Sequence, residues 1–390
     1  MQTQAAKSIS EIFASNLREN KIIYYEDINL LHQNFDELNF DDIKQYFLVG
    51  GKESCIPEEL SDFFSNSDMG KSRTQHMFSV YLLGIYCYDN IKYIRDSFHD
   101  FIKRIYDKTS ETNSPDANLR KDFLYLWFLT ALFHDMGYHY EKKGDNDNSD
   151  YHFIITRKNM LNKDNLGSKP VLGIPKDIQF AAADYFEHRR NNVLFNEHLC
   201  TDHGFAGGYL LFKTLQKLHN EKKSYEQTIK SPIQNDKLLF DPLIFEWYNK
   251  PSAWAIICHN IWLAEAGTGN AVKYEKLGMQ KLIFQPGYSP IKCEKHPLLF
   301  LLCFVDTIEP LKLKDNNILN STLLSVNKNS ELTLIFNSCN ETICSVCPFT
   351  EKYAKKLCTN LDFLKSTTFT TIPNQNSIKF IFGKSAENAE

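Results

Sequence analysis

Apolar residues recur at helical spacing along much of the chain. Between Thr74 and Ile94 they follow the three-to-four-residue repeat of an amphipathic helix. An unbroken apolar run from Phe123 to Phe133 dominates a second predicted helix at 121–134. The same spacing predicts further helices at 178–186, 204–218, 253–266 and 296–308. We therefore expect a mainly α fold.

Glycine and proline mark the expected ends and contacts of these helices. Gly267 and Pro310 should end the last two of them, because neither residue readily continues a helix. In the helix at 204–218, Gly207 and Gly208 would let the backbone approach a neighbouring helix closely. The pattern therefore predicts tightly packed helices in the middle of the chain.

The two ends of the chain have a different character. Residues 1–70 are expected to form short helices and loops, with one helix start at Asp41–Asp42. After about residue 320, strand-like segments at Glu331–Phe336 and Ser377–Phe382 flank a helical patch at 350–364. We predict an N-terminal helical extension (1–70), a helical body (71–318) and a small C-terminal α/β appendage (319–390).

The composition is that of an ordinary globular protein. The 390 residues are 43% hydrophobic and 24% charged, which is ordinary for a globular chain. The longest apolar runs are shorter than the about 20 residues that span a bilayer, and the first residues lack the apolar core of a signal peptide. A net charge of −4 gives no sign of nucleic-acid binding. We expect a cytoplasmic protein without a membrane partner, and leave a homo-oligomer open.

The ten cysteines form no compact framework and are expected to be reduced. Cys344 and Cys347 form a Cys-x-x-Cys pair, with Cys339 and Cys358 nearby. A zinc ribbon would need a second such pair, so structural thiols are the favoured interpretation.

A set of histidines and aspartates stands beside the predicted apolar helices. His134–Asp135 closes the longest apolar run, although with 12 histidines roughly one His-Asp pair is expected by chance. The pair matters because other metal-binding residue types accompany it: His76, His203, His259 and Asp306. Imidazole and carboxylate donors suit a divalent ion, with Mn, Fe, Ni, Mg and Zn not distinguished. Asp135 could bridge two ions, since a carboxylate has two oxygens.

The order His76, His134–Asp135, Asp306 resembles the HD superfamily of metal-dependent phosphohydrolases. Arg73-Thr74-Gln75-His76 is similar to the Arg-x-x-His of its deoxynucleotide triphosphohydrolases. The resemblance covers roughly residues 70–310 and implies an HD-domain helical bundle at 71–318 that is the catalytic domain.

Two further positions resemble the HD-GYP phosphodiesterases. His203 with Gly207 is similar to their His-x-x-x-Gly, and His259 matches one of their paired histidines. Asn260 stands where the second histidine of that pair would be, and the lysine usual after Gly137 is absent.

The resemblance implies two metal ions and a phosphohydrolase. His76, His134 and Asp306 would bind one ion, and His203 and His259 the other, with Asp135 between them. Metal-activated water would then hydrolyse a small phosphorylated substrate, a nucleotide or cyclic nucleotide.

Several cationic residues could hold that substrate. Arg73 is the expected phosphate contact, because a guanidinium matches phosphate oxygens. His139, Arg189 and Arg190 are further candidates, although Glu187–Arg190 also fits a solvated charge cluster.

Two other functions stay open. The same ligand order is similar to HD-fold di-iron oxygenases of the myo-inositol oxygenase group, whose ligands are of the same type. A non-catalytic sensor or scaffold is less favoured, because degenerate members usually lose ligands and all six are present here.

Overall fold

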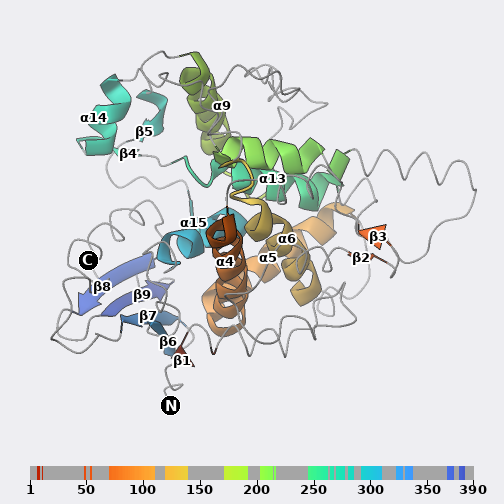
Figure 1. Ribbon diagram of the computed structural model, residues 1–390, viewed down its shortest axis with the longest axis vertical. Coiled ribbons are helices and arrows are strands. Elements are labelled where there is room, and N and C mark those ends of the chain that lie inside the picture. The colour runs from red at the N-terminus through yellow and green to blue at the C-terminus, as the bar shows by residue number, and fades with distance from the viewer. Residues whose placement is uncertain are drawn as a thin grey trace, which may run out of the picture.

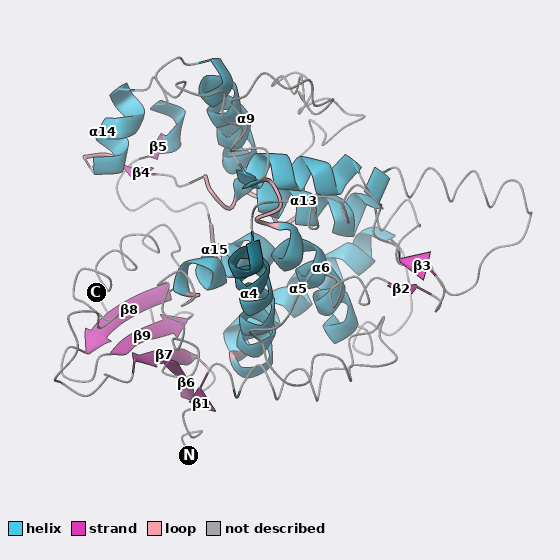
Figure 2. Ribbon diagram, in the orientation of Figure 1, coloured by secondary structure: helices cyan, strands magenta, loops and turns pink. Residues whose placement is uncertain are grey.

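The structure is a computed structural model of the chain. It describes residues 7–8, 11, 48–49, 53–54, 70–109, 119–138, 171–191, 203–213, 215–216, 245–261, 264–267, 269–276, 280–284, 291–309, 322–327, 330–336, 367–372 and 377–382. Most of these residues are helical, as the hydrophobic pattern predicts (Figure 2).

Three helices, α4 (Gly70–Asn90), α5 (Lys92–Thr109) and α6 (Leu119–Phe133), form one side of the core. Trp127 of α6 lies against α4 and donates its indole N–H to the carbonyl oxygen of Tyr81 at 2.8 Å. A Cβ atom at Gly84 would lie 2.1 Å from the Trp127 ring, so only glycine allows this approach. The contact fixes α4 against α6, and both helices lead to the candidate site.

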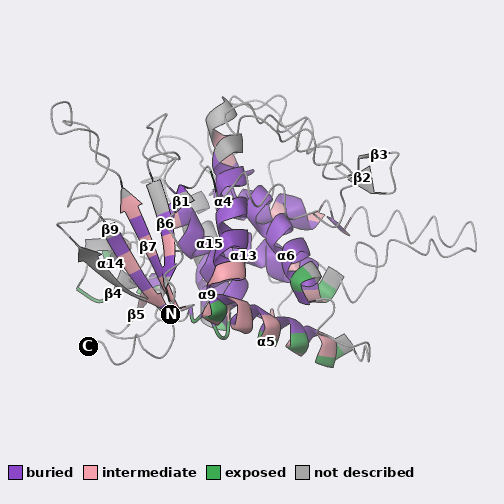
Figure 3. Cartoon of the chain, turned by 90° about the horizontal axis from the view of Figure 1, so that it is seen from below, coloured by how far each residue is buried: buried purple, intermediate pink, exposed green. Residues whose placement is uncertain are grey.

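Two apolar helices complete the centre of the body. α13 (Lys250–Cys258) follows the π-helix η6 (Phe245–Asn249), and α15 (Pro297–Ile308) begins with a proline at its first position. Both are buried almost all round, as expected for helices in the middle of a large core (Figure 3). Peripheral elements are α9 (Lys176–Asn191), α14 (Gly269–Lys276), η7 (Gln280–Leu282), β4 (Ala264–Glu265) and β5 (Ile283–Phe284).

A five-stranded antiparallel sheet lies at one end of the molecule (Figure 1). Its order is β1–β6–β7–β9–β8, so a strand near the N-terminus forms one edge. The strands are β1 (Lys7–Ser8), β6 (Thr322–Asn327), β7 (Glu331–Phe336), β8 (Thr367–Ile372) and β9 (Ser377–Phe382). A separate two-stranded pair joins β2 (Leu48–Val49) and β3 (Glu53–Ser54).

The sheet packs on α15 through aromatic rings. Phe304 of α15 meets Phe380 and Phe382 of β9 edge to face, each at 5.2 Å between ring centroids. All three rings are buried. Because Phe304 is two residues before Asp306, the sheet supports the helix that bears a predicted metal ligand.

Three predicted helix ends are wrong. The helix expected at 178–186 continues to Asn191 in α9. The helix expected at 74–94 breaks at Ile91, where α4 ends and α5 begins. The helix expected at 253–266 ends at Cys258, well before Gly267. There, the Nδ1 of His259 donates to the carbonyl oxygen of Ile256 at 2.6 Å and the His259 N–H reaches the same oxygen at 3.4 Å. The His259 side chain thus bonds the Ile256 carbonyl oxygen, which would accept a backbone N–H if the helix continued for another turn.

Some expectations lie outside the described residues. These are the helix start at Asp41–Asp42, the helical patch at 350–364 and the cysteines at 339, 344, 347 and 358. Within the described part, no helix is both long enough and apolar enough to cross a membrane.

Candidate metal centre

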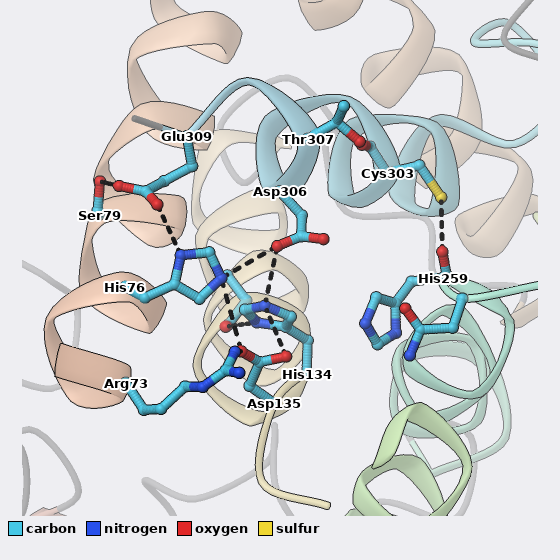
Figure 4. A network of polar contacts seen from close by, with 12 residues as sticks. Arg73, His76, Ser79, His134, Asp135, His259, Cys303, Asp306, Thr307 and Glu309 are labelled. Carbon is cyan, nitrogen blue, oxygen red and sulfur yellow. Dashed lines mark hydrogen bonds and ion pairs between the residues drawn. The ribbon is translucent and has the colours of Figure 1, made fainter. Parts of the chain in front are cut away.

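The six predicted ligands converge at the centre of the helical body. His76 lies on α4, His134 and Asp135 follow α6, and Asp306 lies on α15. His203 begins a helical segment at 203–213, and His259 directly follows α13 (Figure 4). All six are buried, His203 least so at 9% exposure.

The donor atoms fall into two groups whose members each lie within 4.8 Å of one another. The first, called here the His76 group, is His76, His134 and Asp306. The second, the His203 group, is Asp135, His203 and His259. Either group could hold a metal ion, as the sequence predicts.

The separations within the centre match those around a bound ion. Two donors at about 2.1 Å from one ion lie about 3.0 Å apart at a right angle and about 3.4 Å apart at the tetrahedral angle. Oδ1 of Asp306 lies 3.0 Å from Nε2 of His76 and 3.4 Å from Nε2 of His134. The donors are therefore spaced for coordination without a large rearrangement.

Asp135 faces both groups: Oδ2 lies toward His76, and Oδ1 lies between His134 and His203. Its Oδ2 lies 3.6 Å from Nε2 of His76, and its Oδ1 lies 3.6 Å from Nε2 of His203. Oδ1 also lies 3.4 Å from Nε2 of His134. This placement is what a bridging carboxylate requires.

Two histidines have their ring nitrogens fixed by the main chain. Nδ1 of His134 donates to the carbonyl oxygen of Ala131 at 2.7 Å, and Nδ1 of His259 to that of Ile256 at 2.6 Å. Each Nε2 is then a lone-pair nitrogen, and within the described structure both are buried without a hydrogen-bond partner. A buried nitrogen without a partner is costly, and a metal bond would satisfy it. These residues fit a metal ion.

The charges of the centre also suit a cation. Burial lowers the pKa of His259 to about 4, helped by the nearby His134 and His203, so this imidazole is neutral near pH 7. Burial alone would raise the pKa of Asp135, but the surrounding histidines outweigh it and hold that pKa well below its usual range. A neutral imidazole and an ionised carboxylate are the metal-binding forms of these side chains.

Close glycine contacts bring His203 to the other ligands. A Cβ at Gly137 would lie 1.8 Å from the carbonyl oxygen of His203, and one at Gly208 would lie 2.4 Å from that of Ala253. A Cβ at Gly204 would lie 2.8 Å from Cε1 of His259. Glycine therefore lets the segment at 203–213 approach both the end of α6 and α13, as expected from Gly207 and Gly208.

Arg73 lies at the edge of the centre and contacts it directly. Its Nη1 donates to Oδ2 of Asp135 at 2.9 Å, while its side chain remains 36% exposed. The guanidinium also stacks on the Tyr138 ring at 3.8 Å, and that ring stacks on His203 at 3.7 Å between centroids. Tyr138 thus connects the expected phosphate contact, Arg73, to His203, a predicted metal ligand.

Three residues hold the ligands in ways that the sequence did not reveal. Glu309, fully buried, accepts a hydrogen bond from Nδ1 of His76 at 2.7 Å. The hydroxyl of Ser79 donates to the same carboxylate at 2.6 Å. On the other side, the Asn260 amide donates to Nε2 of His203 at 2.7 Å. One sign of this support is present in the sequence: Ser79 and Glu309 each follow a predicted ligand, His76 and Asp306, by three residues.

The structure does not describe the side chains of the other substrate-binding candidates. Arg189 and Arg190 belong to α9, but their side chains lie outside the described part, and so does His139. Their contact with substrate stays a prediction.

Comparison of the chain with protein-family models, curated proteins and solved structures found no match. The functional interpretation therefore depends on the residues and geometry of the site itself.

Proposed function

We propose that the chain is a metal-dependent phosphohydrolase of the HD type, acting on a phosphoester or phosphoanhydride in a nucleotide or cyclic nucleotide. The helical body would be an HD-domain bundle and residues 319–390 a small α/β appendage. The observation that supports this function most is Asp135, which faces both donor groups while it binds Arg73.

The ligand set supports a centre of two divalent ions. His76, His134 and Asp306 would hold one ion and His203 and His259 the other, with Asp135 shared. When bound, such ions neutralise charge on phosphoryl oxygens and make a hydroxide nucleophile accessible near neutral pH.

The protein side chains would orient the substrate. Arg73 is partly exposed beside a buried centre, so its guanidinium can exchange Asp135 for a phosphoryl oxygen. The Tyr138 ring limits the positions of that guanidinium from one face. The six predicted metal ligands are buried, and their burial excludes bulk water, which strengthens each charge interaction in the site.

A hydrolysis panel tests this function. Purified protein should be analysed for metals, then given nucleotides and cyclic dinucleotides under anaerobic conditions with Mn²⁺, Mg²⁺, Ni²⁺ or Fe²⁺. A parallel Fe²⁺ sample in air should be assayed for oxygen consumption. We expect phosphate or nucleotide products with at least one ion. Iron-dependent oxygen consumption without hydrolysis would instead indicate a di-iron oxygenase, and ligand binding without turnover would indicate a sensor.

A further inference from the structure

The two donor groups are supported by different surroundings. Each group has one histidine that donates Nδ1 to a main-chain carbonyl oxygen, His134 in the His76 group and His259 in the His203 group. His76 donates Nδ1 to a carboxylate, that of Glu309. A carboxylate behind an imidazole fixes the ring and makes its other nitrogen a stronger ligand, whereas a neutral carbonyl does so less.

Glu309 is itself held in place. It is the residue directly after α15, where its N–H bonds the carbonyl oxygen of Val305 at 3.0 Å. Its two oxygens contact different side chains of α4, Oε2 the ring of His76 and Oε1 the hydroxyl of Ser79 (Figure 4). A buried carboxylate bound at both oxygens has little freedom to move, so it orients His76 toward the centre.

Formal charge differs between the groups as well. Asp306 and Glu309 place two carboxylates at the His76 group. In the His203 group Asp135 is the one carboxylate among the three donors, and its Oδ2, the oxygen toward His76, is paired with the cationic Arg73 at 2.9 Å. A divalent ion is therefore attracted more strongly to the His76 group.

The His203 group must also give up a hydrogen bond. Nε2 of His203, the nitrogen nearest Asp135, accepts from the Asn260 amide at 2.7 Å. Binding of an ion through this nitrogen exchanges that hydrogen bond for a metal bond. Nε2 of His76 also gives up a hydrogen bond, to Oδ1 of Asp306 at 3.0 Å, but both of those atoms would then bind the ion. At the His203 group the Asn260 amide loses its acceptor without binding the ion, which lowers the net gain in free energy there.

We propose that the two halves of the centre are unequal, with Glu309 as the positioning residue that makes the His76 group the tighter half and the first to be filled. This inference rests on the metal centre of the proposed function, but not on hydrolysis. The His203 group then fills at higher metal concentration, and occupancy of that half would limit activity when the ion is scarce.

Titration with Mn²⁺ tests the proposal, with free Mn²⁺ counted by its room-temperature EPR signal. Wild-type protein should bind one ion tightly and a second more weakly. His259→Ala should remove the weak step and leave the tight step, which isolates the His76 group. Glu309→Gln should weaken the tight step about 10–100-fold, both in that background and alone, where the weak step serves as the comparison. Glu309→Asp or Ser79→Ala should weaken the tight step less.

Asp122→Asn is the matched control, because it neutralises another buried carboxylate, one that accepts a hydrogen bond from Tyr106. Asp122 lies on α6 twelve residues before His134, about 18 Å along the helix axis. The change should leave both steps unaltered, and circular dichroism should verify that each variant is folded.

Three results would overturn the proposal: two equal steps in the wild type, an unchanged tight step in Glu309→Gln, or an equal weakening of both steps. Hydrolysis is measured separately in the same samples. Stepwise binding without hydrolysis would reject the proposed function alone, whereas hydrolysis with an unaffected Glu309→Gln would reject this inference alone.

Discussion

Arg73 places its guanidinium 2.9 Å from Oδ2 of Asp135, the carboxylate between the two donor groups. The pair joins a partly exposed cation to a buried anion. Burial and Asp135 act in opposite directions on the pKa of Arg73: burial lowers it, but Asp135 and Tyr138 raise it, and the net shift is upward. Arg73 therefore stays charged, and competes with a metal ion for the same oxygen.

This competition predicts opposite effects on binding and catalysis. Arg73→Gln should bind Mn²⁺ at least as tightly as the wild type, because the competing cation is gone. Its hydrolysis should fall about 10–100-fold, because a charge-assisted hydrogen bond to phosphate contributes about 1.5–3 kcal/mol. Mn²⁺ titration and kcat/KM measure the two effects.

Arg120→Gln is the control for this change, since Arg120 pairs with Asp89 at 3.1 Å on the surface of the same body. Neither Mn²⁺ affinity nor kcat/KM should change in this variant. Loss of Mn²⁺ binding in Arg73→Gln would show that Arg73 supports the metal centre instead of competing with it.

The approach of Gly204 to His259 predicts sensitivity to a single methyl group. In Gly204→Ala the new Cβ would lie 2.8 Å from Cε1 of His259 and 2.9 Å from the carbonyl oxygen of Ile256. We expect about 1–3 kcal/mol lower stability and weaker binding at the His203 group. Urea denaturation and Mn²⁺ titration measure these effects.

Gly267→Ala separates backbone strain from crowding at the site. Gly267 has a φ of 85°, and a Cβ added there would meet no atom within 4 Å, so alanine costs stability through the backbone alone. Metal binding should be preserved. Equal loss of metal binding in both variants would contradict the crowding explanation.

His296 predicts a pH-dependent stability of the apoprotein. Burial lowers the pKa of His296 from 6.5 to about 4. A hydrogen bond with the Gly173 backbone opposes this shift, the cations Arg104 and Lys295 add to it, and Glu294 opposes it least. The folded state therefore binds fewer protons than the unfolded state between these values, so stability is lost as pH falls from 6.5 toward 4.

Denaturation of chelator-treated protein between pH 4.5 and 7, in roughly half-unit steps, measures this slope. His296→Gln should reduce the slope, although His259 titrates in the same range and keeps part of it. Lys292→Gln is the control, because Lys292 is an exposed lysine that is not among the groups acting on the pKa of His296. An unchanged slope in His296→Gln would contradict the assignment.

The sheet and α15 should be energetically coupled through their rings. Phe304→Ala should cost about 3–5 kcal/mol, because it opens a cavity against β9. In a double-mutant cycle with Phe380→Ala, we expect a coupling of about 0.5–1.5 kcal/mol. Strictly additive losses in urea denaturation would show that the edge-to-face contact contributes nothing beyond burial.

The sequence was informative where the signal is local. Apolar repeats predicted α6 and α15 closely, and β7 and β9 to the residue, because burial of one face leaves its period in the chain. The Thr-rich β8 and the two-residue β1 leave almost no such period. Their pairing depends on partners far away in the chain, which local patterns do not contain.

The candidate site shows the same limit. Histidines and aspartates at helix ends indicated ligands, and the structure brings all six together. Glu309 was missed because its role depends on a contact with His76, 233 residues away, and a glutamate is seldom fully buried. The early end of α13 was missed because a hydrogen bond from the His259 side chain, not Gly267, limits the helix.

We propose that Asp135 joins two metal ions in a hydrolytic centre, and Asp135→Ala is the decisive variant for this role. Metal content and anaerobic Mn²⁺-dependent hydrolysis of nucleotide substrates should be measured on the same folded samples of wild type and variant. We predict two ions per chain and turnover in the wild type, and loss of both in Asp135→Ala. Full hydrolytic activity in the folded variant would show that Asp135 does not join two metal ions in a hydrolytic centre.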